Sequence, residues 1–182
     1  QAVGKLRMDI DALGCDFLSF SGHKFHGPQG VGGLYVRRGV KLDPLLFGGS
    51  QENGLRAGTE NLPGIAGVGR AAEIRSKSLA STIERLEALR NRFESGVLQQ
   101  VPDTHINGDP ANRVCNTTNL RFAGVDGEAL VARLDQAGVQ CSQSSACTNQ
   151  RPEPSYVLRA MGLSESQAYS SVRFSVSELN SE

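Results

Sequence analysis

The sequence has no tryptophan, only three histidines, and no apolar run that approaches the roughly 20 residues needed to span a membrane. Lysine plus arginine equals aspartate plus glutamate at 19 each, so no net charge favours nucleic acid or an anionic membrane as a partner. The four cysteines lack CxxC spacing, which argues against a zinc site, and their density is too low for a secreted disulfide scaffold. We therefore expect no metal, no nucleic acid, no membrane and a cytoplasmic location.

A chain of 182 residues can form one ordinary domain or two small ones. Its 21 glycines exceed the typical share of about 7%, which fits many tight turns near a phosphate. Apolar periodicity predicts helices over residues 65–99, 126–136 and 154–162, and strands over residues 16–21, 33–37, 113–122, 139–142 and 172–176. This order indicates a layered α/β or α+β protein, with a boundary in the long helix that separates domains 1–75 and 76–182.

Lys24 follows the apolar strand of residues 16–21 and precedes a glycine-rich turn. Ser21 and His23 lie beside it, so a hydroxyl, an imidazole and an amine fall within four residues. A partly desolvated amine beside phosphate donors is what a Schiff-base enzyme requires. An ordinary surface lysine after a strand fits this local pattern equally well.

Cys147 lies among small polar residues, and Pro152 and Pro154 follow it. Neither a helical nor a strand period continues there, which predicts a mobile loop. A cysteine on a polar loop is more often exposed and reactive than a core cysteine, although most cysteines are small buried hydrophobes. Cys141, six residues earlier, is interpreted as a core residue, with a disulfide to Cys147 as the alternative.

Seven motifs occur in order along nearly the whole chain. They are residues 20–24 (FSGHK), 27–32 (GPQGVG), 48–52 (GGSQE), 56–59 (RAGT), 145–148 (SACT), 153–160 (EPSYVLRA) and 171–175 (SVRFS). Together they resemble the pyridoxal-phosphate-dependent cysteine desulfurases, class-V aminotransferase relatives of the bacterial iron–sulfur and nitrogen-fixation type. The resemblance implies an α/β protein with the PLP-transferase fold type I. Residues 1–75 would then be the C-terminal part of the large domain, and residues 76–182 the small α+β domain with the cysteine loop.

The resemblance also implies a cofactor site. Lys24 would bind pyridoxal 5′-phosphate covalently and later act as the general base. Ser21 and His23 would donate to the phosphate, and Gln1 would hydrogen-bond the phenolic oxygen. Thr59 would reach the phosphate in the other subunit, which makes the active site a feature of a homodimer.

In the same family pattern, Arg173 would bind the carboxylate of L-cysteine through its bidentate guanidinium. Cys147 would attack the substrate sulfur, releasing L-alanine and carrying a persulfide. The sulfur would then pass to an acceptor or scaffold protein for iron–sulfur cluster or thiocofactor synthesis. One departure is the run at residues 142–145 (SQSS), where relatives carry a glycine. Its loss is expected to stiffen the loop.

Related enzymes carry an aspartate that pairs with the pyridine nitrogen and a histidine that stacks on the ring, both before the position equivalent to Gln1. We therefore expect this chain to be roughly the C-terminal half of the enzyme, and inactive when isolated. Two alternatives stay open. One is a non-catalytic fragment or subunit that needs a separate N-terminal half, and the other is a selenocysteine lyase-like enzyme. An aminotransferase would have no use for Cys147.

Overall fold

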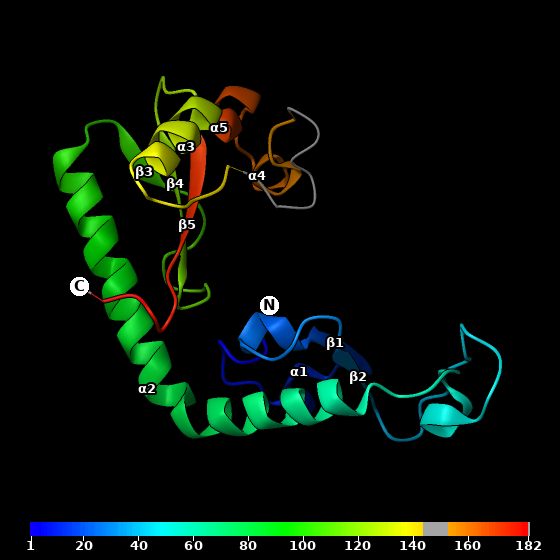
Figure 1. Cartoon of the computed structure of the whole chain (residues 1–182). Helices are drawn as coiled ribbons and strands as arrows, with labels where there is room; N and C mark the ends of the chain where they lie inside the picture. The colour runs from blue at the N-terminus through cyan, green and yellow to red at the C-terminus, as the bar shows by residue number, and fades with distance from the viewer. Residues whose placement is uncertain (144–152, 182) are drawn as a thin grey trace. The chain divides into compact units, whose positions relative to one another are not determined.

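The computed structural model describes residues 1–143 and 153–181 (Figure 1). The chain divides into two compact units, Gln1–Ser81 and Thr82–Glu182, and each is described by itself. The division falls within helix α2 (Leu62–Gln100), the helix in which the sequence places its domain boundary. The assignment of these units to a large and a small domain stays a prediction. In the described part of the chain, no helix has the length and apolarity to cross a membrane.

The first unit contains a β-hairpin followed by the start of α2. Its elements are α1 (Ile10–Leu13), β1 (Phe17–Ser21), the 3-10 helix η1 (Gly22–Phe25), β2 (Gly32–Val36) and the 3-10 helix η2 (Gln51–Gly54). Strands β1 and β2 pair antiparallel, from Phe17 opposite Val36 to Ser21 opposite Gly32. Both strands were predicted from the sequence, and the hairpin sets where the η1 turn begins.

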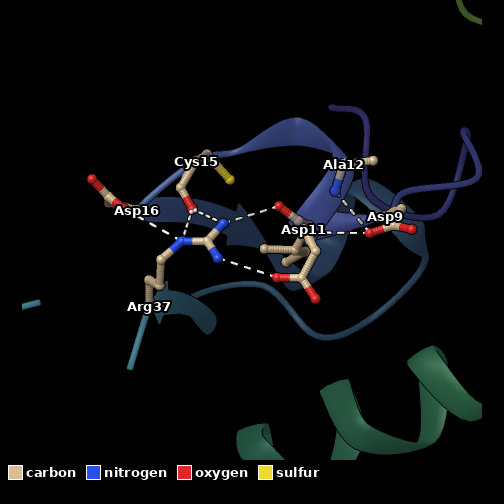
Figure 2. A network of polar contacts seen from close by, with 7 residues as sticks. Asp9, Asp11, Ala12, Cys15, Asp16 and Arg37 are labelled. Atoms are coloured by element: carbon tan, nitrogen blue, oxygen red, sulfur yellow. Dashed lines mark hydrogen bonds and ion pairs between the residues drawn. The ribbon is translucent and has the colours of Figure 1, made fainter. Parts of the chain in front are cut away.

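Arg37, directly after β2, fixes the start of β1 (Figure 2). Its Nε and NH2 groups donate to the Cys15 carbonyl oxygen at 3.2 and 3.1 Å. The guanidinium also pairs with Asp11 at 3.1 Å and Asp16 at 3.3 Å. The Asp9 carboxylate caps α1 by accepting from the Asp11 backbone N–H at 2.9 Å. These contacts join α1 to both strands of the hairpin and hold β1 in place ahead of the Lys24 turn.

The second unit is a three-stranded antiparallel sheet with helices. Its elements are β3 (Thr104–Ile106), β4 (Thr117–Phe122), α3 (Gly127–Gln136), α4 (Tyr156–Ala160), α5 (Glu165–Tyr169) and β5 (Ser171–Ser175), in the sheet order β3-β4-β5. The predicted helix after Asp126 is confirmed, and the Asp126 side chain caps it. The predicted strand over residues 139–142 is wrong, because only Ser142 pairs, in an isolated bridge with Arg173.

The core of this unit forms on one face of the sheet. Alternate residues of β4 are buried, so Leu120 and Phe122 point to the same side, and Val172 of β5 pairs with Leu120. Side chains from α2 and α3 pack against this cluster: Phe93, Val97, Leu130 and Val131. Figure 1 shows α3 lying over the sheet. Because side chains alternate along a strand, Arg173 lies on the face opposite to that of Val172 and Phe174.

A buried ion pair joins α2 to the segment before β4. The Arg113 guanidinium makes a bidentate contact with Glu94, and the NH2 to Oε2 distance is 2.8 Å. The two side chains are only 15% and 6% exposed. Arg90, also buried, donates to the Val114 carbonyl oxygen at 2.9 Å. Burial by itself raises the pKa of Glu94, but the hydrogen bonds and the nearby positive charges outweigh it, so the pKa lies below its ordinary value.

Candidate active site

The turn that carries Lys24 presents polar groups outward from a buried anchor. Phe25 is only 3% exposed, and its ring lies 6.1 Å from that of Phe20. Ser21, His23 and Lys24, which lie beside Phe25 in the sequence, are exposed. A single short turn therefore presents the hydroxyl, the imidazole and the amine that the sequence singled out.

Close backbone packing explains why this turn needs glycine. The Gly22 N–H donates to the Val31 carbonyl oxygen at 2.9 Å, and the Gly27 N–H donates to the Gly22 carbonyl oxygen at 2.9 Å. A Cβ atom on Gly22 would lie 2.5 Å from the Val68 side chain of α2. Only a residue without a Cβ lets the backbone of η1 approach α2 this closely. The turn is thus held from both sides.

Gln1 precedes a second turn, closed by a hydrogen bond from the Lys5 N–H to the Ala2 carbonyl oxygen, which packs against the first. The Lys5 ammonium donates to Gln1 Oε1 at 3.2 Å. Gly4, with a positive φ of 78°, lies so close to Phe25 that a Cβ atom would come within 2.6 Å of the Phe25 Cβ. The structure therefore brings the N-terminal turn next to the turn of Lys24.

Thr59 lies in the exposed loop between η2 and α2. The Arg56 guanidinium donates to the Gly58 carbonyl oxygen at 2.7 Å, and the Gly58 N–H donates to Gln51 Oε1 at 3.1 Å. These two hydrogen bonds organise the loop. Within the described residues, no hydrogen bond or ion pair joins Thr59 to Lys24. The role expected for Thr59, in the other subunit, stays a prediction.

Arg173 lies on β5 in the second unit, with a half-buried side chain. Its backbone pairs with Ser142, where the Arg173 N–H donates at 2.7 Å and the Ser142 N–H donates back at 3.1 Å. Cys147 lies outside the described residues. The stretch of chain that leads toward Cys147 nevertheless begins beside Arg173, because Ser142 is only five residues before it.

The residues around Lys24 fit pyridoxal 5′-phosphate by the chemistry of their donors. The Ser21 hydroxyl makes no capping bond to η1. Within residues 1–143 and 153–181, no side-chain hydrogen bond occupies Ser21, His23 or Lys24. A hydroxyl and an imidazole can donate to a phosphate, and a primary amine can condense with an aldehyde. The described residues leave Lys24 exposed, so they do not by themselves desolvate its amine as the sequence argument requires.

No group of three or more histidine, cysteine, aspartate or glutamate side chains within the described residues is arranged to hold a metal ion. The donors near Lys24 are a hydroxyl, an imidazole and an amine, which suit an anion and a carbonyl group. These groups suit a phosphorylated aldehyde, because a primary amine can condense with its carbonyl group.

Comparison with known proteins agrees with this chemistry. The family Aminotransferase class-V matches residues 1–182. A cysteine desulfurase of Trichormus azollae is 47% identical over all 182 residues, which make up 46% of that protein. Among solved structures, a NifS-like protein is 37% identical with a TM-score of 0.88, and the match covers all of this chain and 46% of that one. SspA in complex with cysteine is 35% identical with a TM-score of 0.72, over 97% of this chain and 48% of that one.

The chain thus spans about half the length of the curated relatives that it matches. The structural match confirms the predicted fold class, the α/β PLP-transferase fold of the NifS-like proteins. The likeness to cysteine desulfurases inferred from the seven motifs is also confirmed. The chain belongs to the class-V aminotransferase family.

Proposed function

We propose that the natural gene product containing this chain is a pyridoxal-phosphate-dependent cysteine desulfurase. It converts L-cysteine to L-alanine and holds the released sulfur as a persulfide on Cys147. The observation that carries this proposal is the turn at Lys24, where Ser21, His23 and the lysine lie exposed together in a chain 47% identical to cysteine desulfurases.

Each candidate site residue of the first unit has a defined role in this proposal. Bound pyridoxal 5′-phosphate supplies a carbonyl group and an electron-withdrawing ring. Lys24 holds the cofactor through its amine and then moves a proton at the substrate Cα. Ser21 and His23 donate to the phosphate, and Gln1 donates to the phenolic oxygen. Thr59 donates to the phosphate bound in the other subunit of a homodimer.

Arg173 binds the carboxylate of L-cysteine, because the planar guanidinium matches a carboxylate with two parallel hydrogen bonds. Its side chain is half-buried on the polar face of the sheet, where partial desolvation strengthens such a contact. The solved structure of SspA contains cysteine, which supports an amino acid of this kind as the substrate here.

Cys147 carries out the sulfur transfer as a thiolate. Its Sγ atom attacks the sulfur of the substrate, so a new S–S bond forms and the substrate Cβ–Sγ bond breaks. The electron pair of the broken bond stays on the carbon skeleton, which takes up a proton at Cβ and leaves as L-alanine. Cysteine and the enzyme thiol together give alanine and the persulfide, so the step needs no external oxidant.

The persulfide on Cys147 then passes its outer sulfur to an acceptor or iron–sulfur scaffold protein in the cytoplasm. A persulfide sulfur is electrophilic, so the acceptor must present a thiolate or another soft nucleophile. Acceptor thiols stay reduced in a cytosolic environment.

Replacing the lysine tests the proposal. The natural gene product should bind pyridoxal 5′-phosphate with visible absorbance and release alanine from cysteine. Lys24→Ala should abolish both the covalent cofactor and turnover, because no other amine occupies the turn. Lys41→Ala, which removes another exposed lysine of the same unit, is the matched control and should behave as the unsubstituted protein. Full turnover by Lys24→Ala would reject the assignment.

A further inference from the structure

Gln143 is the last described residue before residues 144–152, and its side chain is held by a long-range hydrogen bond. The Nε2 group donates to the Tyr169 carbonyl oxygen at 2.6 Å. Tyr169 ends α5, and β5, the strand of Arg173, begins two residues later. The Gln143 side chain thus caps α5 and ties its own backbone to the element that leads into the Arg173 strand.

The hydrogen bond between Gln143 and Tyr169 also depends on Gly127, the first residue of α3. A Cβ atom on Gly127 would overlap the Tyr169 carbonyl oxygen and come within 2.9 Å of Gln143 Nε2. Glycine at this position therefore leaves the space in which the amide and the carbonyl meet. A cavity of about 550 Å³ adjoins the contact and is lined by the carboxylates Asp126, Glu128 and Glu165.

The backbone attachment next to Gln143 is slight. Ser142 pairs with Arg173 in an isolated bridge of two hydrogen bonds rather than in a strand. Two consecutive residues are thus attached to the same part of the fold, Ser142 through its backbone and Gln143 through its side chain. An isolated bridge has no neighbouring ladder to support it, and the Gln143 side-chain hydrogen bond adds a second attachment one residue later.

We propose that Gln143 is a positioning residue for sulfur transfer. Its side chain fixes the point from which the chain runs to Cys147, in register with the strand that carries Arg173. Cys147 is four residues further along the sequence. This inference rests on the proposed function and assigns Gln143 no contact with substrate or cofactor.

Four variants separate the hydrogen bond from other properties of the side chain. Gln143→Ala removes it, and Gln143→Glu keeps the length but replaces the donor with an acceptor facing a carbonyl oxygen. Gln143→Lys restores a donor of comparable reach, and the nearby carboxylates favour its charge. Gln140→Ala is the matched control, since Gln140 is exposed on the same segment and has no hydrogen bond within the described residues.

The first measurement is backbone hydrogen exchange of the Ser142 and Arg173 amides in the 182-residue chain. One hydrogen bond is worth roughly a 2- to 10-fold change in an equilibrium. Gln143→Ala and Gln143→Glu should therefore speed exchange at both amides by about that factor, while Gln143→Lys and Gln140→Ala should not. Unchanged exchange in Gln143→Ala would overturn the anchoring role.

The second measurement follows the natural gene product. Gln143→Ala and Gln143→Glu should slow persulfide formation on Cys147 about 2- to 10-fold, as one lost hydrogen bond implies. The cysteine concentration for half-maximal spectral change of the cofactor should stay constant, because the variants leave the side chains of Arg173 and of the cofactor turn unchanged. Gln143→Lys should recover the rate. Faster exchange without any loss of persulfide rate would overturn the positioning role. Absence of persulfide in the unsubstituted protein would instead reject the proposed function, and the exchange result would still decide the anchor.

Discussion

Removing the charge of Glu94 should strongly destabilise the second unit. Glu94→Gln leaves the largely buried Arg113 guanidinium without its carboxylate and removes the negative charge near Arg90, and an amide can accept only through one oxygen. Breaking a buried ion pair by removing one partner costs about 3–5 kcal/mol. For a unit of this size, 1 kcal/mol shifts the unfolding midpoint by about 4–8 °C, so the midpoint should fall by at least about 12 °C.

This prediction has a defined pH dependence. The pKa of Glu94 is depressed in the folded chain, so its contribution to the free energy of unfolding is complete above the ordinary value of 4.5. That contribution is lost as the pH falls through the folded-state pKa. The difference in stability between the unsubstituted chain and Glu94→Gln should therefore be largest near neutral pH and shrink below about pH 4.5.

Thermal unfolding followed by circular dichroism measures this effect, and hydrogen exchange at the Leu120 and Val172 amides locates it in the second unit. Glu73→Gln is the control, because Glu73 is an exposed residue of the same helix that pairs with Lys77 at 2.6 Å. The control should cost little, since exposed ion pairs are screened by solvent. An unchanged midpoint for Glu94→Gln, or a stability difference that does not depend on pH, would show that the charge of Glu94 does not stabilise the second unit.

Three further predictions concern binding, packing and the isolated chain. Arg173→Lys should raise the KM for cysteine at least about tenfold in steady-state assays, because an ammonium cannot reproduce two parallel hydrogen bonds; an unchanged KM would exclude the carboxylate role. Gly127→Ala should lower the free energy of unfolding by about 1–3 kcal/mol, because its Cβ atom would overpack against Tyr169. Gly69→Ala is the control and should not lower the midpoint of thermal unfolding, because its Cβ atom would meet no atom within 4 Å. The 182-residue chain alone should bind pyridoxal 5′-phosphate weakly and show no turnover, because its described residues leave Lys24 exposed; turnover near that of a full-length relative would contradict this.

Elements with a long or strong local signal could be predicted from the sequence. The apolar period indicated α2 almost to its ends and a helix over residues 126–136, where α3 forms. The strand expected over residues 139–142 does not form, because the Gly138 and Val139 N–H groups bond to carbonyls at the end of α3. Those donors are then unavailable to a strand ladder. Strand β3 has only three residues, too few for a period to show.

In the candidate site, too, local features could be predicted from the sequence and long-range contacts could not. Ser21, His23 and Lys24 are neighbours in the sequence, so their meeting on one turn follows from local structure. The packing of the N-terminal turn against Phe25 depends on the close approach of Gly4, which no local pattern encodes. From the sequence, residue 143 was noted only as part of the run 142–145, where relatives carry a glycine. Its bond to Tyr169 joins residues 26 positions apart and required the fold.

Mass spectrometry shows directly whether Cys147 receives the sulfur of the substrate. The natural gene product, loaded with pyridoxal 5′-phosphate, would be incubated with isotopically sulfur-labelled L-cysteine and digested under non-reducing conditions. We expect one labelled sulfur on the peptide that contains Cys147. In Cys147→Ser, the labelled persulfide should be absent, while cysteine should still change the cofactor spectrum. Labelled sulfur on Cys141 instead, or alanine formation undiminished in Cys147→Ser, would contradict this role of Cys147.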